Sequence, residues 1–314
     1  MQLQRIPKGT PDWTTPLNEN FDVLDKGLPA IEMANRLYEG KDLTALYLLE
    51  ANQSAYPTIW HWLNARVQDR NFDNLNVGDF VPVVATDGVV YEIEIAGINT
   101  YKGFGDPQLV DDHIDFITRD CHPTTRTMNR VNFNNGTTVS SSPWLASEGE
   151  AWLNSKQKNV VSVAAATPTL VSADYRTTGV LDKLPASLRE FIRPKRLRIP
   201  RRYTAGQLLV NDNSWDLVNL EGLWIPFEFE VAGNNFWATE GYEGGLVQYP
   251  IFANNSKRCK KAGKDGVPTH WWCASAYRDY STNFVSVSAE GFVNSTTASL
   301  TTIRVSFGFR YLRV

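Results

Sequence analysis

Residues 74–98, NLNVGDFVPVVATDGVVYEIEIAGI, indicate the kind of fold that this chain adopts. Apolar side chains alternate with polar ones on both sides of Thr86-Asp87-Gly88, and two alternating runs around such a turn are typical of a β-hairpin. Residues 111–121, DDHIDFITRDC, predict a further strand. More short strands are expected at 205–211, 222–231, 284–287, 292–294 and within 301–312.

Helical segments are expected to be short and few in this part of the chain. One is predicted at 147–158, where Trp152 and Leu153 can face inward, and one at 186–192, between Pro185 and Pro194. Short strands, two helices and long loops rich in Asn, Gly, Ser and Thr describe an α+β domain. Its helices are expected on one side of twisted antiparallel sheets.

The first 66 residues differ from the rest. Leu17, Phe21, Leu24 and Leu28 follow one another at spacings of 4, 3 and 4, which is one stripe of a helix. Shorter helical stretches follow at 43–49 and 57–67. Because so short a helix is marginal in water, the stripe must pack either on its own domain, as a cap, or on copies of itself. We therefore divide the chain into an N-terminal helical docking or oligomerisation segment, 1–66, and a main domain, 67–314.

Composition excludes several classes of protein. Of the 314 residues, 42% are hydrophobic and 21% charged, which is typical of a folded chain. The net charge of −3 provides no basic field for nucleic acid. No window approaches 18 apolar residues and no signal sequence opens the chain, so we expect synthesis in the cytoplasm and no membrane insertion. The basic segment 193–203 is interpreted as a loop that pairs with internal carboxylates, or alternatively as a contact for an acidic partner.

Catalytic motifs are missing from the sequence. It contains no phosphate loop, dinucleotide-binding glycine motif, nucleophile elbow or zinc-protease motif. A strand would divide Asp111, Asp112, His113 and Asp115 between two faces, so solvated charge is preferred to a metal site there. We expect no enzyme, no metal and no cofactor.

The three cysteines are predicted to be reduced. Cys273 follows Trp271-Trp272 in what should be a buried strand, where its thiol should react slowly. Cys259 lies among four cations, and cations near a thiol favour the thiolate. They are Arg258, Lys260, Lys261 and Lys264. Cys259 should therefore react first.

Aromatic residues crowd the last third of the chain. Most must belong to the core, and a subset in loops would form a recognition face, because rigid aromatic side chains give contact area at low entropic cost.

An ordered series of segments carries a resemblance to a known group of proteins. It comprises NLNVGDFVPV (74–83), EIEIAGIN (92–99), HIDFITRDC (113–121), EGEAWLNS (148–155), LPASLREFIRP (184–194), GLWIPFEFEV (222–231), THWWCASAY (269–277), NFVSVSAEG (283–291) and TIRVSFGFRYL (302–312). The series resembles an uncharacterised domain common in bacteriophage virion and bacterial surface proteins. That domain is related to the C-type-lectin-like fold of formylglycine-generating enzymes and of variable phage receptor-binding tips. Residues 6–28 separately resemble the N-terminal segment of phage tail-fibre and baseplate proteins.

This resemblance implies a C-type-lectin-like domain in a phage virion protein, a tail-fibre or baseplate component on the particle surface. Its partners would be other virion proteins and a host cell-surface glycan or protein, and a homotrimer would be the expected assembly. A purely structural virion protein without a receptor is the alternative, and an enzyme of the formylglycine-generating type is a third. The calcium-site triplets of true lectins are missing, and Cys259 and Cys273 do not reproduce the paired copper ligands of the enzymes.

The same resemblance places receptor contacts near the C-terminus, in loops between the late strands. The residues it indicates are Tyr277, Arg278, Tyr280, Asn283, Asn294 and Arg304. A competing face is 234–242. Docking or oligomerisation is assigned to Leu17, Phe21, Leu24 and Leu28.

Overall fold

The computed structural model describes residues 38–51, 54–104, 109–136, 142–165, 167–203, 210–238 and 247–314. The predicted helical stripe of Leu17, Phe21, Leu24 and Leu28 lies outside these residues. The described α-helices are α2 (Leu43–Glu50), α3 (Ile59–Gln68), α4 (Pro143–Ala146), α5 (Glu148–Leu153), α6 (Ala186–Arg189) and α7 (Glu228–Ala232). The strands are β1 (Phe80–Val84), β2 (Val90–Ile98), β3 (His113–Thr118), β4 (Gln157–Val163), β5 (Thr169–Asp174), β6 (Lys195–Tyr203), β7 (Val210–Leu220), β8 (Trp271–Ala276), β9 (Asn283–Val287), β10 (Val293–Thr297) and β11 (Gly308–Leu312).

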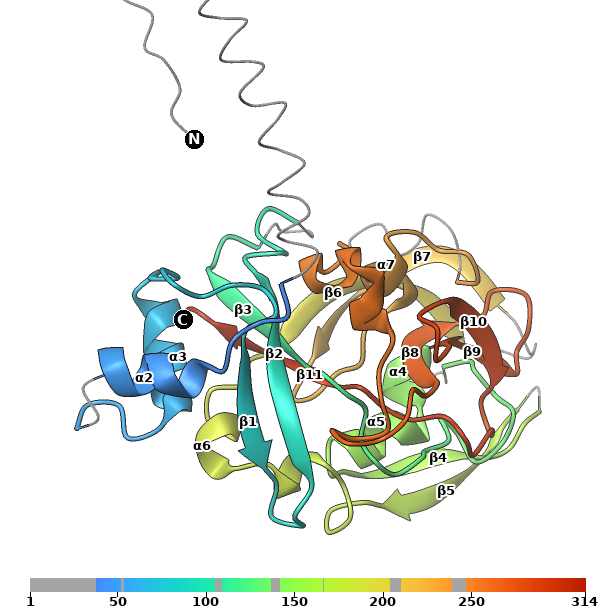
Figure 1. Cartoon of the computed structure of the whole chain (residues 1–314). Coiled ribbons are helices and arrows are strands. Elements are labelled where there is room, and N and C mark those ends of the chain that lie inside the picture. The colour runs from blue at the N-terminus through green and yellow to red at the C-terminus, as the bar shows by residue number, and fades with distance from the viewer. Residues whose placement is uncertain are drawn as a thin grey trace, which may run out of the picture. The chain divides into compact units, whose positions relative to one another are not determined.

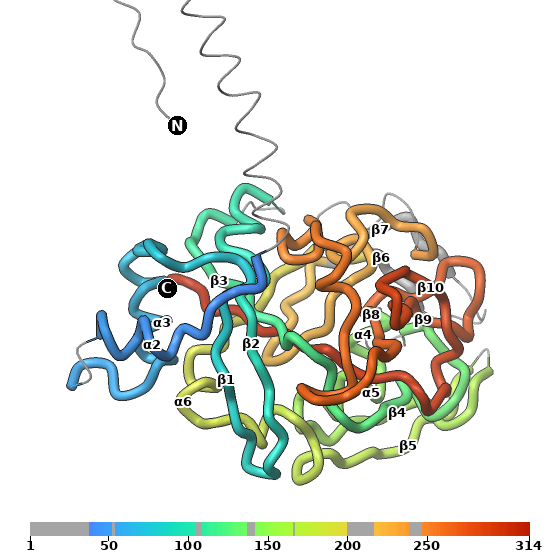
Figure 2. Tube along the Cα trace, in the orientation of Figure 1, coloured from blue at the N-terminus to red at the C-terminus, as the bar shows by residue number. Residues whose placement is uncertain are grey.

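The predicted hairpin forms half of a four-stranded antiparallel sheet. Its strand order is β1-β2-β3-β11, so the strand nearest the C-terminus pairs with β3 (Figures 1 and 2). In the hairpin Val84 pairs with Val90 across the turn, where Gly88 has a φ of +85° that a side chain would strain. The hairpin and the strand predicted at 111–121 are confirmed.

Helix α3 packs against this sheet through Trp60. The Trp60 ring lies 5.9 Å from Phe116, 6.0 Å from Phe309 and 6.1 Å from Tyr311, measured between ring centroids. The compact unit that contains the sheet accordingly runs from Gly40 to Val314, and it begins earlier than the expected boundary at residue 67. Helices α2 and α3 thus belong to the core of this unit.

A second sheet and two ribbons complete the unit. The second sheet is three-stranded and antiparallel, in the order β10-β9-β8 (Figure 1). The ribbons are β4 with β5 and β6 with β7. Trp271, Trp272 and Cys273 on β8 are fully buried, as predicted for Cys273. The α+β class is confirmed.

Four predictions about local structure were wrong. The helix expected at 147–158 ends at Leu153, because Ser155 has a φ of +52°, and the chain then forms β4. The strand expected at 222–231 instead contains α7, whose first turn is closed by a hydrogen bond from the Phe227 N–H to the Glu230 carboxylate (2.9 Å). The basic segment forms β6 rather than a loop. Within 67–314 the described residues contain four short α-helices, α4 to α7, where two were expected.

Candidate recognition surface

The loop between β8 and β9 carries three of the six predicted contact residues, Tyr277, Arg278 and Tyr280. The Tyr277 and Tyr280 rings are 5.1 Å apart between centroids, and the Tyr280 side chain is 58% exposed. The Tyr277 N–H donates to the carbonyl of Asn283, the first residue of β9. Three predicted residues therefore lie in one loop, and the fourth, Asn283, is bonded to it at the start of β9.

The competing face at 234–242 adjoins this loop as far as it is described, up to Ala238; residues 239–242 lie outside the described part. The Trp237 ring stands edge-on to Tyr277 at 5.3 Å, and the Arg278 N–H donates to the Trp237 carbonyl (2.9 Å). The Trp237 indole N–H donates to the carbonyl of Val293 on β10 (3.3 Å). The two predicted faces are thus one surface. We define the aromatic surface as Phe236, Trp237, Tyr277 and Tyr280.

Its exposure is unusual for large apolar rings. Phe236 is 57% exposed and Tyr280 is 58% exposed. Clustered exposed aromatic side chains mark interaction sites more often than single ones do. Such rings can stack on sugars or pack against a protein side chain.

Asn134 holds the β8–β9 loop from the interior of the protein. Its side chain is fully buried, and its amide donates to the carbonyls of Tyr277 (3.3 Å), Tyr280 (2.6 Å) and Asn283. The Asn134 N–H also donates to the Ser281 carbonyl (2.8 Å). Buried amide groups bound to several carbonyls restrict a loop to one conformation. No feature of the sequence VNFNNG around Asn134 indicates this role.

Glu228, at the start of α7, fixes the loop that follows this helix, which carries Phe236 and Trp237. Its buried carboxylate accepts hydrogen bonds from the backbone N–H groups of Phe236 (3.0 Å), Trp237 (3.1 Å) and Ala238 (2.7 Å). Burial raises the pKa of Glu228, an effect that the three N–H groups oppose. Both loops of the aromatic surface are therefore held by buried polar side chains that the sequence did not single out.

Asn294 and Arg304 lie outside this loop. Asn294 is exposed on β10, where it pairs with Ser286, and its side-chain oxygen accepts from the Ser295 N–H (2.7 Å). The guanidinium of Arg304 donates to Thr269 (2.7 Å) and to the Pro123 carbonyl (3.2 Å). The backbone of Arg304 forms an isolated β-bridge with Trp271, which lies at the opposite end of β8 from Tyr277. Its contacts are those of a residue that holds the fold.

A buried ionic cluster joins four elements. Arg310 on β11 donates twice to Asp115 on β3 (2.7 and 2.8 Å), and Lys195 on β6 pairs with Glu230 on α7. Tyr101 donates to the same Glu230 carboxylate. These four charged side chains are at most 1% exposed, and two cations balance two carboxylates. We assign the cluster to the core.

Asp112 and Asp115 are therefore not solvated, and the prediction of solvated charge was wrong for these two residues. Asp115 is fully buried, and Asp112, 4% exposed, accepts from Lys102 (2.7 Å), which lowers its pKa. Burial lowers the pKa of His113 to about 4, so its ring is neutral at neutral pH. Among the described residues no group of three or more His, Cys, Asp or Glu side chains is placed to hold a metal ion.

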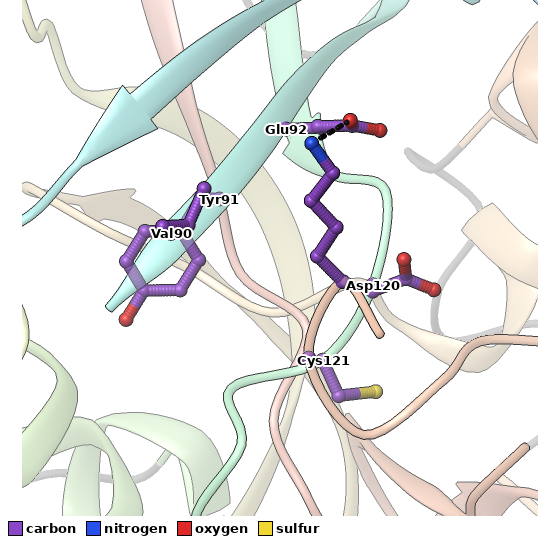
Figure 3. A pocket seen from close by; sticks show the side chains of 7 residues that line it. Val90, Tyr91, Glu92, Asp120 and Cys121 are labelled. Carbon is purple, nitrogen blue, oxygen red and sulfur yellow. Dashed lines mark ion pairs between the residues drawn. The ribbon is translucent and has the colours of Figure 1, made fainter. Parts of the chain in front are cut away.

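Two hollows lie beside the β1–β2 turn. The smaller, of about 10 Å³, has room for a single water and is lined by Val90, Tyr91, Glu92, Asp120, Cys121, Gly263 and Lys264 (Figure 3). Lys264 pairs there with Glu92 at 3.3 Å (Figure 3). Burial raises the pKa of Cys121 to about 12, so its thiol stays protonated. The larger is an open groove of about 450 Å³ between 87–90 and 262–266.

The expected thiolate at Cys259 was also wrong. Burial and Glu290 raise the pKa of Cys259, and only Arg258 opposes them. Two other nearby cations are engaged elsewhere: Lys260 is buried and donates to the carbonyls of Thr118 and Arg119, and Lys264 pairs with Glu92. Cys259 is still the most accessible of the three cysteines, because it is half-buried whereas Cys121 and Cys273 are buried.

No helix in the described part of the chain is long and apolar enough to cross a membrane. Comparison with known families finds one match: a model described as a domain of unknown function, DUF6273, covers residues 116–309, more than half of the chain. No curated protein matches the chain significantly, and no solved structure does.

Proposed function

This chain belongs to the DUF6273 family, and from that premise we propose that it is a non-enzymatic recognition protein of a bacteriophage particle. Its lectin-like domain binds the host surface through the aromatic surface. The N-terminal residues dock it to other virion proteins of a tail fibre or baseplate, as a homotrimer. The resemblance of the ordered sequence segments to phage virion domains supports this setting, and the antiparallel sheets with long loops agree with a lectin-like fold.

One observation carries the proposal. Phe236 and Tyr280 are more than half exposed, yet the loops that bear them are held from the interior by Asn134 and Glu228. Exposing apolar rings on ordered loops gains nothing for folding. The order of these loops does lower the entropic cost of binding, because they lose little conformational freedom when a ligand binds.

The binding test replaces Tyr277, Arg278 and Tyr280 together by Ala in the full chain. Labelled protein is then measured on intact bacteria of the host. We expect the triple variant to lose about 1.4 kcal/mol or more of binding free energy, which weakens binding at least about tenfold. The control variant replaces Phe104 and Val110, which are exposed apolar residues outside the aromatic surface, and should bind as the parent does.

Unchanged binding by the triple variant, with an unchanged unfolding midpoint, would reject the aromatic surface as the receptor site and favour a purely structural virion protein.

The docking test removes residues 1–37 only, because α2 and α3 belong to the main unit. Loss of incorporation into particles is expected, and retained incorporation would reject docking through this segment.

A further inference from the structure

In the part of the chain that the structure describes, strand β5 has a free edge. It pairs with β4 on one side only, and it lies at the border of the unit (Figure 1). All residues from Thr169 to Ser172 are exposed, including Leu170 at 43% and Val171 at 39%. Apolar side chains on an edge strand are the arrangement that proteins usually avoid.

The hydrogen-bond pattern identifies the backbone groups that face outward. The Tyr175 N–H donates to the Lys156 carbonyl (3.0 Å), one position beyond the pair of Gln157 with Asp174. Hydrogen-bonded and non-hydrogen-bonded pairs alternate along an antiparallel ladder. Val171, opposite Val160, therefore bonds to β4, whereas Leu170 and Ser172 direct their N–H and C=O groups outward. None of the other described residues forms a backbone hydrogen bond to these outward groups.

This edge lacks the features that block strand pairing. No charge occurs from Thr169 to Ala173, and the one proline nearby, Pro168, precedes the strand. By contrast, edge strand β1 carries Pro82 at its centre. The edge of β10 is partly covered, since the Trp237 indole donates to the Val293 carbonyl.

We propose that β5 pairs with β5 of a second copy of this chain, antiparallel and centred on Val171. In that register Leu170 faces Ser172 of the other copy, and the two outward residues of each strand form four backbone hydrogen bonds. The two Val171 side chains meet directly. Val160 faces Val171 within each copy and is 1% exposed, so the valine side chains of both copies form one continuous row on the same side of the sheet.

Charge and symmetry favour a second copy as the occupant. The strand is complementary to itself, because each exposed apolar residue meets an uncharged one. The two Asp174 residues would be six positions apart along the pair, about 20 Å, which exceeds the screening length of about 8 Å. Centring on Ser172 would instead place Asp174 opposite Leu170. The contact is independent of receptor binding and adds a twofold interface to whatever assembly the N-terminal residues make.

The test uses the full chain with Cys259→Ser, which removes the accessible native thiol. Val171→Cys in this background should form a covalent dimer under mild oxidation, because facing residues of a non-hydrogen-bonded pair have Cα atoms about 4.5 Å apart. Leu170→Cys is the matched control: its two copies would be diagonal, about 7–8 Å apart, too far for a disulfide. Cross-linking of Leu170→Cys as fast as Val171→Cys would overturn the proposed register.

A second variant keeps the proposal falsifiable without cysteine chemistry. Val171→Lys places two cations face to face across the pair, and an exposed lysine at an edge does not disturb the fold. The mass measured by light scattering at high protein concentration should fall by a factor of two. A mass equal to that of the parent, or a Val171→Cys variant that stays monomeric on a non-reducing gel, would overturn the contact. Binding of Val171→Lys to host cells is measured in parallel and reports separately on the recognition function.

Discussion

The side-chain amide of Asn134 donates to the backbone carbonyl of Tyr280 at 2.6 Å across 146 positions of sequence. The same amide reaches the carbonyls of Tyr277 and Asn283, so one buried side chain closes the whole β8–β9 loop. This arrangement makes the loop a rigid support for two tyrosines.

Asn134→Ala should destabilise the protein by about 1–3 kcal/mol, since it leaves buried carbonyls without a donor. Urea unfolding at neutral pH measures the loss. Asn132→Ala is the control, because Asn132 is exposed and bonded to Ser299, and its replacement should change the free energy of unfolding by less than about 0.5 kcal/mol. An Asn134→Ala variant as stable as the control would show that Asn134 does not hold the loop.

The pH dependence of stability should report Glu228. Because its pKa is raised above the ordinary value of 4.5 in the folded protein, the folded state binds more protons than the unfolded state at pH values just above 4.5. The contribution of Glu228 is therefore fully present below pH 4.5 and is lost as pH rises through the folded pKa. Unfolding free energies measured from pH 4 to 8 should decline less steeply in Glu228→Gln than in the parent; parallel curves would contradict the shift.

The buried pair of Lys195 and Glu230 should respond differently to single and double substitution. Glu230→Gln leaves the Lys195 ammonium without its carboxylate and should cost about 3–5 kcal/mol. Adding Lys195→Met should recover part of that loss, because no unpaired charge then remains. Asp182→Asn, which breaks the exposed pair with Arg189, is the control and should change little. Equal losses in the single and double variants would indicate that the two charges are not coupled.

Thiol labelling should separate the three cysteines. Cys259 should react first and Cys121 and Cys273 only on unfolding, because the latter two are buried. Glu290→Gln should speed labelling of Cys259, since Glu290 raises its pKa. Peptide mapping after brief exposure to a thiol reagent identifies the site. Fastest reaction at Cys273 would show that β8 is not buried.

Much of the local structure could be predicted from the sequence. The hairpin around Thr86-Asp87-Gly88, strand β9 and the burial of Cys273 follow from patterns within about ten residues, where side-chain alternation and turn residues act directly on the backbone. Tyr277 and Tyr280 of one predicted face and Trp237 of the competing face lie together in the structure, and their role in recognition stays a prediction.

What the tertiary structure alone decided involves residues far apart in the chain. Asp115 and Arg310 are 195 positions apart, and the sequence around Asp115 suggested solvated charge, because an aspartate is stable in the core only where a distant cation meets it. The same reason applies to Asn134 and Glu228, whose neighbours in sequence do not reveal which backbone groups they bind. Local patterns determine which segments form strands and helices, whereas the pairing of buried polar groups depends on how those segments pack, and that packing brings the two predicted faces together.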